Sequence, residues 1–174
     1  MTAGGDTQEM ESGVGGSARR RARQVALQVL YAIDLGSGRP RGSGDSRRVP
    51  GEWDAATDAP DADAAFESVA SHFEMPGATR SFAHALVVGV RKAIDEIDAT
   101  VSSCSRKWRV DRMAAVDRNI LRLATWELLH TDTPVPVVLD EAIDLARRFA
   151  DDPSPAFVNG ILDAVARAVR EPES

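Results

Sequence analysis

The chain is organised around the stretch VDRNILRLATWELL, residues 116–129. At 100° per residue, its apolar side chains fall on one broad arc. The members of this arc are Val116, Ile120, Leu121, Leu123, Ala124, Leu128 and Leu129. A helix that is apolar over so much of its circumference must be covered from more than one side. The stretch is therefore predicted to form the central helix of a helical bundle.

Length and composition favour one globular unit. The chain has 174 residues and 43% hydrophobic residues, which is enough for one domain with a substantial core. Its only cysteine, Cys104, has no internal disulfide partner, which favours a reducing, cytoplasmic setting. Residues 1–17 hold no apolar run long enough for a signal peptide or a membrane span, so they are predicted to be a disordered tail.

Charge is segregated along the chain. The net charge of −6 argues against indiscriminate nucleic-acid binding. Residues 18–48, however, hold eight arginines against two acids, whereas residues 49–79 hold seven acids and no lysine or arginine. A localised basic surface on an acidic body indicates a selective anionic partner, because a phosphate backbone responds to the local potential.

A second helix is predicted from RRRARQVALQVLY, residues 19–31. The side chains spaced as a core-facing stripe are Ala22, Val25, Ala26, Val29, Leu30 and Ile33. Outside this stripe lie Arg20, Gln24, Leu27 and Tyr31, which follow one another at three or four residues. An arginine-rich helix start followed by an exposed Leu and Tyr is an unusual solvent face.

The arginines of this helix have two interpretations. The first is a solvated charge run whose stems cover the core. The second is phosphate contact by Arg19, Arg20, Arg21 and Arg23, with Leu27 and Tyr31 touching a protein or a base. Four positive charges at a helix N-terminus oppose the helix dipole. Because helix stability does not require that placement, the functional interpretation is favoured.

The remaining segments predict further helices and no strand. Helices are expected at about 62–74, 80–104 (one bent helix or two, capped by Thr79), 139–149 and 157–166, the last preceded by Ser154 as N-cap. Gly89 is expected to allow close helix packing. Residues 36–60, which include Trp53, are rich in Gly, Pro and Asp and are predicted to form a flexible insertion. Thr133–Pro136 is predicted to be an extended link. The fold class is all-α, with six to seven helices.

The segment RKWRVDR, residues 106–112, places a tryptophan among basic residues. Such a composition is typical of a single-strand platform, where a ring stacks on a base and cations hold phosphates. Just before a core helix, a tryptophan is more often a buried plug, so Trp108 is predicted to be buried. Asp111 is expected to cap the helix that follows.

No catalytic constellation is found. His72, His84 and His130 are far apart and share no motif with Cys104. Metal-binding spacings and nucleotide fingerprints are missing as well. The sequence therefore predicts no catalytic residues, no metal, no cofactor and no enzyme.

Four segments together carry a family resemblance. RRRARQVALQVLY, VDRNILRLATWELL, LDEAIDLARRF and FVNGILDAVA, in this order and spacing, resemble the NusB family of bacterial transcription antitermination factors over about residues 18–168. The resemblance implies two small packed helical bundles, placed here at residues 18–170. It also implies binding of single-stranded boxA-type leader RNA together with NusE, a small-subunit ribosomal protein, which helps RNA polymerase resist termination of ribosomal RNA transcription.

The resemblance assigns roles to single positions. Arg19, Arg20, Arg21 and Arg23 match the arginine motif of the implied RNA surface, and Phe157 would lie near it. Tyr31 and Asp117 match positions on the NusE-facing side. The segment ADDPSPA, residues 150–156, departs from the family, because Pro153 and Pro155 stand in a run that is usually more polar and basic.

Two alternatives stay open at this point. One is a homodimeric or purely protein-binding helical module, in which the Arg/Leu/Tyr face is buried against a second copy and RNA binding is masked. The other is a detached NusB-like domain related to those of ribosomal-RNA cytosine methyltransferases. The chain has no glycine-rich cofactor loop, which disfavours an enzyme.

Overall fold

A computed structural model describes residues 15–36 and 59–171. In this part of the chain there are seven α-helices, one short 3-10 helix and no strand, which confirms the all-α prediction. The elements are α2 (Gly16–Gly36), α3 (Ala59–Ala70), α4 (Gly77–Lys92), α5 (Ile94–Cys104), η1 (Val110–Arg112), α6 (Ala115–His130), α7 (Val135–Phe149) and α8 (Ser154–Arg170). The predicted tail and insertion lie mainly outside the described residues, although Gly16 and Ser17 already belong to α2.

Helix α6 is the central helix, as its apolar arc predicts. It contacts α2, α4, α5, α7 and α8. Ile120, Leu121 and Leu123 are almost completely buried. Arg170 of α8 closes the end of α6 by donating hydrogen bonds to the carbonyl oxygens of Glu127, Leu128, Thr131 and Thr133. The bond to Leu128 satisfies a carbonyl that the helix end leaves without an intrahelical partner, and the bonds to Thr131 and Thr133 hold the segment that follows α6.

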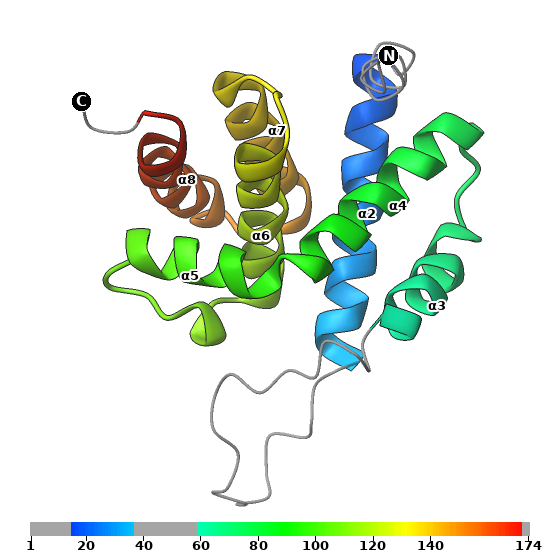
Figure 1. The fold of residues 1–174 in the computed structure, drawn as a ribbon, viewed down its shortest axis with the longest axis horizontal. Helices are drawn as coiled ribbons and strands as arrows, with labels where there is room; N and C mark the ends of the chain where they lie inside the picture. The colour runs from blue at the N-terminus through cyan, green and yellow to red at the C-terminus, as the bar shows by residue number, and fades with distance from the viewer. Residues whose placement is uncertain (1–14, 37–58, 172–174) are drawn as a thin grey trace, which may run out of the picture.

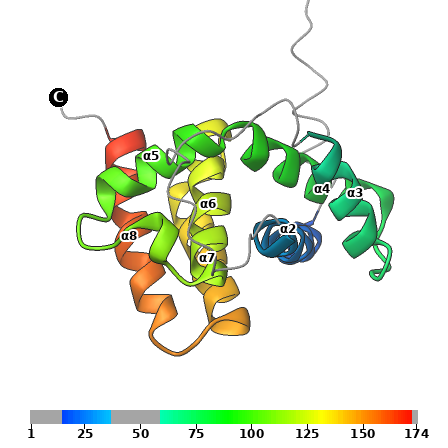
Figure 2. The same cartoon turned by 90° about the horizontal axis from the view of Figure 1, so that it is seen from below.

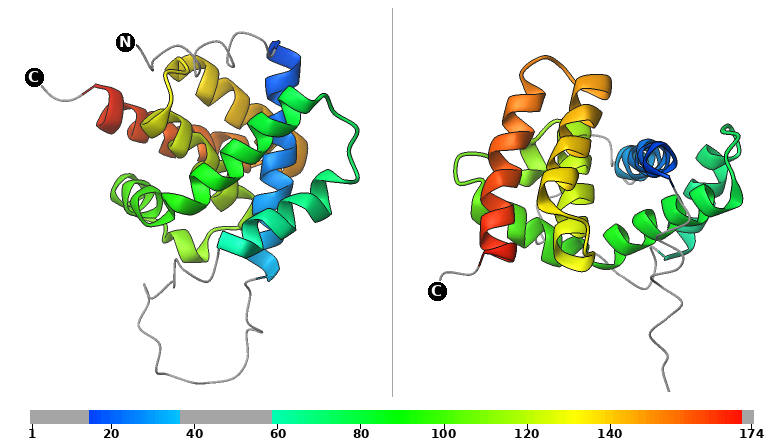
Figure 3. Two further views of the ribbon diagram at one scale, coloured as in Figure 1. Left: turned by 45° about the vertical axis from the view of Figure 1, so that its right-hand side comes forward. Right: turned by 90° about the horizontal axis from the view of Figure 1, so that it is seen from above.

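The helices form two groups that meet at α2 and α6. Helices α5 to α8 pack together, with α7 and α8 side by side, and α2 to α4 form the second group (Figure 1). Seen from below, α2 stands end-on between α6 and the α3–α4 pair (Figure 2). Seen from above, α2 lies between α7 on one side and the α3–α4 pair on the other (Figure 3). The fold thus holds α2 from two sides.

Because other helices cover α2 from two sides, Leu27 does not lie on its solvent face. The prediction that Leu27 is exposed is wrong, because this side chain is only 2% exposed. The six core positions predicted for this helix are all buried, as expected. Helix α2 contacts α3 and α4 on one side and α6 on the other. Its apolar arc is therefore wider than that of a surface helix that packs on one side only.

Several predicted helix starts are displaced by a few residues. Helix α4 begins at Gly77, so Thr79 lies inside the first turn, where it is buried and is not a cap. Asp111 does not cap α6 but lies in η1 and pairs with Arg109.

The last two helices also begin earlier than predicted. Helix α7 begins at Val135 and includes Pro136, because proline is tolerated in the first helical turn. Ser154 is not the cap of α8 but its first residue, and Pro153 occupies the cap position.

The stretch predicted at 80–104 is two helices that bend at Ala93, whose backbone has left the helical region. Gly89 of α4 lies against the indole of Trp126 on α6, and a Cβ atom at position 89 would overlap the ring. The expectation that Gly89 permits close packing is therefore confirmed. The glycine lets α4 approach the central helix at the point where the two helix groups meet.

We expect Gly89→Ala to lower the free energy of unfolding by about 1–3 kcal/mol, because the added methyl overpacks the contact with Trp126. The matched control is Gly77→Ala in the same helix, where a Cβ meets nothing within 4 Å. Urea denaturation should show equal or higher stability for the control, because alanine favours the helix. Equal stability of both variants would contradict the packing role.

Candidate nucleic-acid and partner interface

One stripe of α2 faces solvent along the whole helix. Its exposed or half-buried members are Ser17, Arg20, Arg21, Gln24, Gln28, Tyr31, Ala32 and Leu35. Arg20 and Tyr31 are three helical turns apart on this stripe, roughly 16 Å along the axis. One rigid helix thus presents cations at its first turns and apolar side chains near its end.

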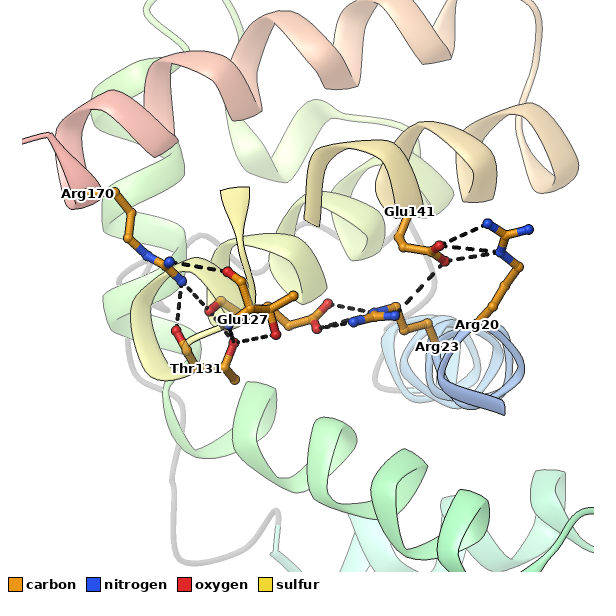
Figure 4. Close-up of polar contacts among 7 residues, drawn as sticks. Arg20, Arg23, Glu127, Thr131, Glu141 and Arg170 are labelled. Atoms are coloured by element: carbon orange, nitrogen blue, oxygen red, sulfur yellow. Dashed lines mark hydrogen bonds and ion pairs between the residues drawn. The ribbon is translucent and has the colours of Figure 1, made fainter. Parts of the chain in front are cut away.

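Arg20 is exposed but not unpaired. Its side chain is 54% exposed, and its guanidinium lies 3.0 Å from Glu141 of α7 (Figure 4). Asp144, on the same helix, lies 3.4 Å from it. Hydrogen bonds to Glu141, followed by the charge of this carboxylate, raise the pKa of Arg20 above its usual value. A shallow pocket of about 330 Å³ lies beside this pair, between Glu141 and the first turns of α2.

Arg23 does not belong to the surface. Its side chain is 4% exposed, and its Nη2 lies 2.7 Å from Oε1 of Glu127, which is 3% exposed (Figure 4). Arg23 was predicted to contact phosphate with its three neighbours, and this burial corrects that prediction. The physical reason is Glu127, a carboxylate inside the core arc of α6, which requires a cation because an unpaired buried charge is costly.

Arg19 and Arg21 remain near the solvent face. The Arg21 guanidinium lies over the ring of Phe73, 5.3 Å from its centroid, and the residue is exposed. Arg19 is half-buried. The arginine motif is therefore divided: Arg20 and Arg21 are accessible at the first turns of α2, Arg19 is partly accessible, and Arg23 belongs to the core.

Trp108 and Phe157 form an aromatic pair at the edge of the core, against which Phe157 packs. The prediction that Trp108 is a buried plug is wrong, because the residue is 59% exposed. Its ring meets that of Phe157 edge-on, with centroids 5.7 Å apart. In the segment between α5 and η1, the Ser105 hydroxyl donates a hydrogen bond to the carbonyl oxygen of Trp108. Phe157 is thus placed beside a basic, aromatic segment.

Tyr31 and Asp117 come from two helices that are tied together. Asp34 of α2 accepts hydrogen bonds from Arg118 (2.7 Å) and Asn119 (3.0 Å) at the start of α6. Tyr31 is 36% exposed and Leu35 is 54% exposed. Asp117 is 9% exposed, and its Oδ1 has no hydrogen-bond partner in the described part of the chain. A buried carboxylate oxygen without a donor is unusual in a folded protein.

The described residues offer neither a metal centre nor a membrane span. Across residues 15–36 and 59–171, no group of three His, Cys, Asp or Glu residues could hold a metal ion. Within the same ranges, every helix is too short or too polar to cross a membrane.

The family model described as the NusB family matches residues 20–167. The chain belongs to the NusB family. A relative named transcription antitermination protein NusB, from Solibacter usitatus, is 40% identical over 158 residues, which cover 91% of this chain and 94% of the relative. Proteins of this family are antitermination factors and not enzymes, so the prediction of a non-enzymatic antitermination factor is confirmed.

Solved structures give the same fold. NusB of T. maritima is 30% identical, with a TM-score of 0.68 and coverage of 86% of this chain and 90% of that one. A crystal structure of the antitermination factors NusB and NusE in complex with double-stranded RNA is 28% identical, with a TM-score of 0.66 and coverage of 88% and 99%. These matches confirm the NusB-like arrangement of two helix groups.

Sequence reasoning missed the acidic partners of the arginines. Nothing in the spacing of Glu141 and Asp144 along α7 points to α2. Glu127 did carry a signal. It lies four residues after Leu123, on the same face of α6, so a carboxylate inside the core arc could have predicted a buried cation.

We expect Arg23→Met to lower the free energy of unfolding by about 3–5 kcal/mol, because it leaves the Glu127 carboxylate buried and unpaired. The double variant Arg23→Met/Glu127→Leu should recover most of the loss. The control Arg21→Met, two residues away, should cost less than about 1 kcal/mol. Chemical denaturation measures all three, and an unchanged stability of Arg23→Met would show that Arg23 reaches solvent.

Proposed function

We propose that this chain is a non-catalytic adaptor that binds single-stranded boxA-type leader RNA together with NusE. In this role it helps RNA polymerase, in the cytoplasm, resist termination of ribosomal RNA transcription. The observation that carries the proposal is the solvent stripe of α2, with Arg20 and Arg21 at one end and Tyr31 and Leu35 at the other. Membership of the NusB family and the likeness to a NusB–NusE–RNA complex support it.

The RNA contacts are assigned to the first turns of α2. Arg19, Arg20 and Arg21 attract phosphates in a salt-dependent way, while an unpaired strand offers its bases to side chains. Arg23 takes no part, because its guanidinium is buried against Glu127. Phe157 offers an aromatic surface beside Trp108.

Glu141 and Asp144 moderate the arginine contacts. Arg20 lies between these two carboxylates in the free protein, so a phosphate must compete with them for the guanidinium. The negative charge of Glu141 and Asp144 also opposes the approach of any polyanion. RNA binding by the chain alone is therefore expected to be weak, and a partner that adds contacts raises the affinity.

The NusE contacts are assigned to the end of α2 and the start of α6. Tyr31 and Leu35 give an exposed apolar patch, and tyrosine is among the residues that contribute most to protein interfaces. Asp117 is assigned to the same surface by its place in the first turn of α6, although its Oδ1 is buried in the free protein. Because Asp34 links the two helices, this surface needs no large rearrangement on binding.

The direct test is a salt series of RNA titrations with and without NusE. Fluorescence anisotropy should show weak binding of a single-stranded boxA-type RNA to the chain alone and much tighter binding in the presence of NusE. A duplex of the same sequence serves as the comparison. No binding of the single strand in either condition would refute the proposal. Light scattering then shows whether a homodimer has covered the α2 stripe instead.

The double variant Arg20→Gln/Arg21→Gln should weaken RNA binding and lower the salt slope by about 0.7 for each phosphate that is no longer neutralised. Its stability should be almost unchanged, because both side chains lie at the surface. The control Lys92→Gln, an exposed charge at the end of α4, should leave the affinity and the slope as they are. An unaltered slope in the double variant would remove these arginines from the RNA surface.

Tyr31→Ala should weaken NusE binding by about fivefold or more, a loss on the order of 1 kcal/mol, because it deletes the main apolar contact of the patch. Calorimetry of the two proteins without RNA measures this effect. The control Val137→Ala removes a similarly exposed apolar side chain from α7. If both variants bind NusE like the wild type, the partner surface lies elsewhere.

A further inference from the structure

A shallow pocket of about 570 Å³ lies between the segment after α5 and the first turns of α8. Its lining combines aromatic, basic and small residues: Cys104, Arg106, Lys107, Trp108, Phe157 and Gly160. We propose that this pocket is a subsite for one unstacked RNA base, which stacks on Trp108 while Arg106 and Lys107 hold the adjoining phosphates. The inference rests on the proposed function and adds Trp108 and Gly160 to it.

The exposure of Trp108 is the first argument. A tryptophan that is 59% exposed leaves a large apolar ring in water. Phe157 packs edge-on against this ring, with an angle of 86° between the ring planes, and so favours one orientation of the indole. Fixed aromatic faces are what unpaired bases stack on in proteins that bind single strands.

The charges around the pocket are the second argument. Arg106 and Lys107 are exposed, and neither makes an ion pair with any residue in the described part of the chain. Arg20 and Arg23 differ from them, because both are paired with carboxylates. In the free protein, Arg106 and Lys107 therefore carry positive charge beside Trp108 that no carboxylate in the described part of the chain offsets. A polyanion is the complementary occupant, which favours RNA over an apolar peptide.

Gly160 is the third argument. It lies inside α8, where glycine lowers helix stability relative to alanine. A Cβ at position 160 would meet nothing within 4 Å, so packing within the described chain does not require a glycine. Gly89, in contrast, is required by the indole of Trp126. Because Gly160 lines the pocket, its missing side chain leaves room for a ligand to approach the helix backbone.

The first experiment compares Trp108→Ala, Trp108→Phe and the control Val137→Ala in titrations of boxA-type RNA with NusE present. Trp108→Ala should weaken RNA binding by about 5- to 150-fold with an unchanged salt slope, because only stacking is removed. Trp108→Phe should keep most of the affinity, and Val137→Ala all of it. The double variant Arg106→Gln/Lys107→Gln should instead lower the salt slope by about 1.4.

The second experiment separates a binding role of the pocket from a structural one. Gly160→Ala should raise the melting temperature or leave it unchanged, yet weaken RNA binding, while Gly77→Ala should leave RNA binding unchanged. RNAs in which single bases are replaced by abasic sites should reveal one position whose loss costs as much as Trp108→Ala. Combined with that RNA, the Trp108→Ala variant should show no further loss.

Two outcomes would overturn the inference in distinguishable ways. If the wild type binds RNA tightly but Trp108→Ala and Gly160→Ala bind like their controls, the pocket is not a base subsite and the proposed function stands. The pocket is excluded in the same way if Trp108→Ala weakens NusE binding without RNA and leaves RNA binding intact, because the occupant is then a protein. If the wild type binds no RNA even with NusE, both proposals fail.

Discussion

The buried ion pair between Arg23 and Glu127 fixes how the two halves of the molecule meet. It joins α2 to α6, with both side chains almost completely excluded from water. A buried pair contributes little net stability, but losing either member leaves a costly charge. It therefore sets the rotation of α2 about its axis more than it adds stability. With Arg23 turned inward, Arg20, Gln24 and Tyr31 are left on the side that faces solvent.

The pair also belongs to a longer line of polar contacts. Glu141 lies 4.0 Å from Arg23 and 3.0 Å from Arg20, while the main chain of Glu127 accepts a hydrogen bond from Arg170 (Figure 4). The same line thus runs from the exposed arginine of α2 to the last turn of α8. Its acidic members lower the positive potential of the arginine motif, which agrees with a chain whose net charge is −6. Affinity for RNA must then come from several modest contacts and from a partner.

The sequence predicted most of the core because apolar periodicity reports burial directly. The apolar positions predicted for α2 are all buried, and those predicted for α6 are buried except Val116 and Leu129, which are partly buried. The break at Ala93 agrees with the prediction of one bent helix or two. Leu27 and Arg23 were misplaced because the second covering layer of α2 comes from helices distant in sequence. Trp108 was misplaced because composition alone does not tell whether a loop folds over a ring or leaves it in solvent.

Hydrogen exchange of the chain alone, with RNA and with NusE would locate both proposed surfaces in one measurement. We expect NusE to protect the end of α2 and the start of α6, and RNA to protect the first turns of α2 and the region of Trp108 and Phe157. The outer faces of α3 and α4 should stay unchanged. Protection of the α2 stripe that grows with the concentration of the chain alone, with no further change on adding RNA or NusE, would contradict this expectation. That result would make the stripe a self-association surface.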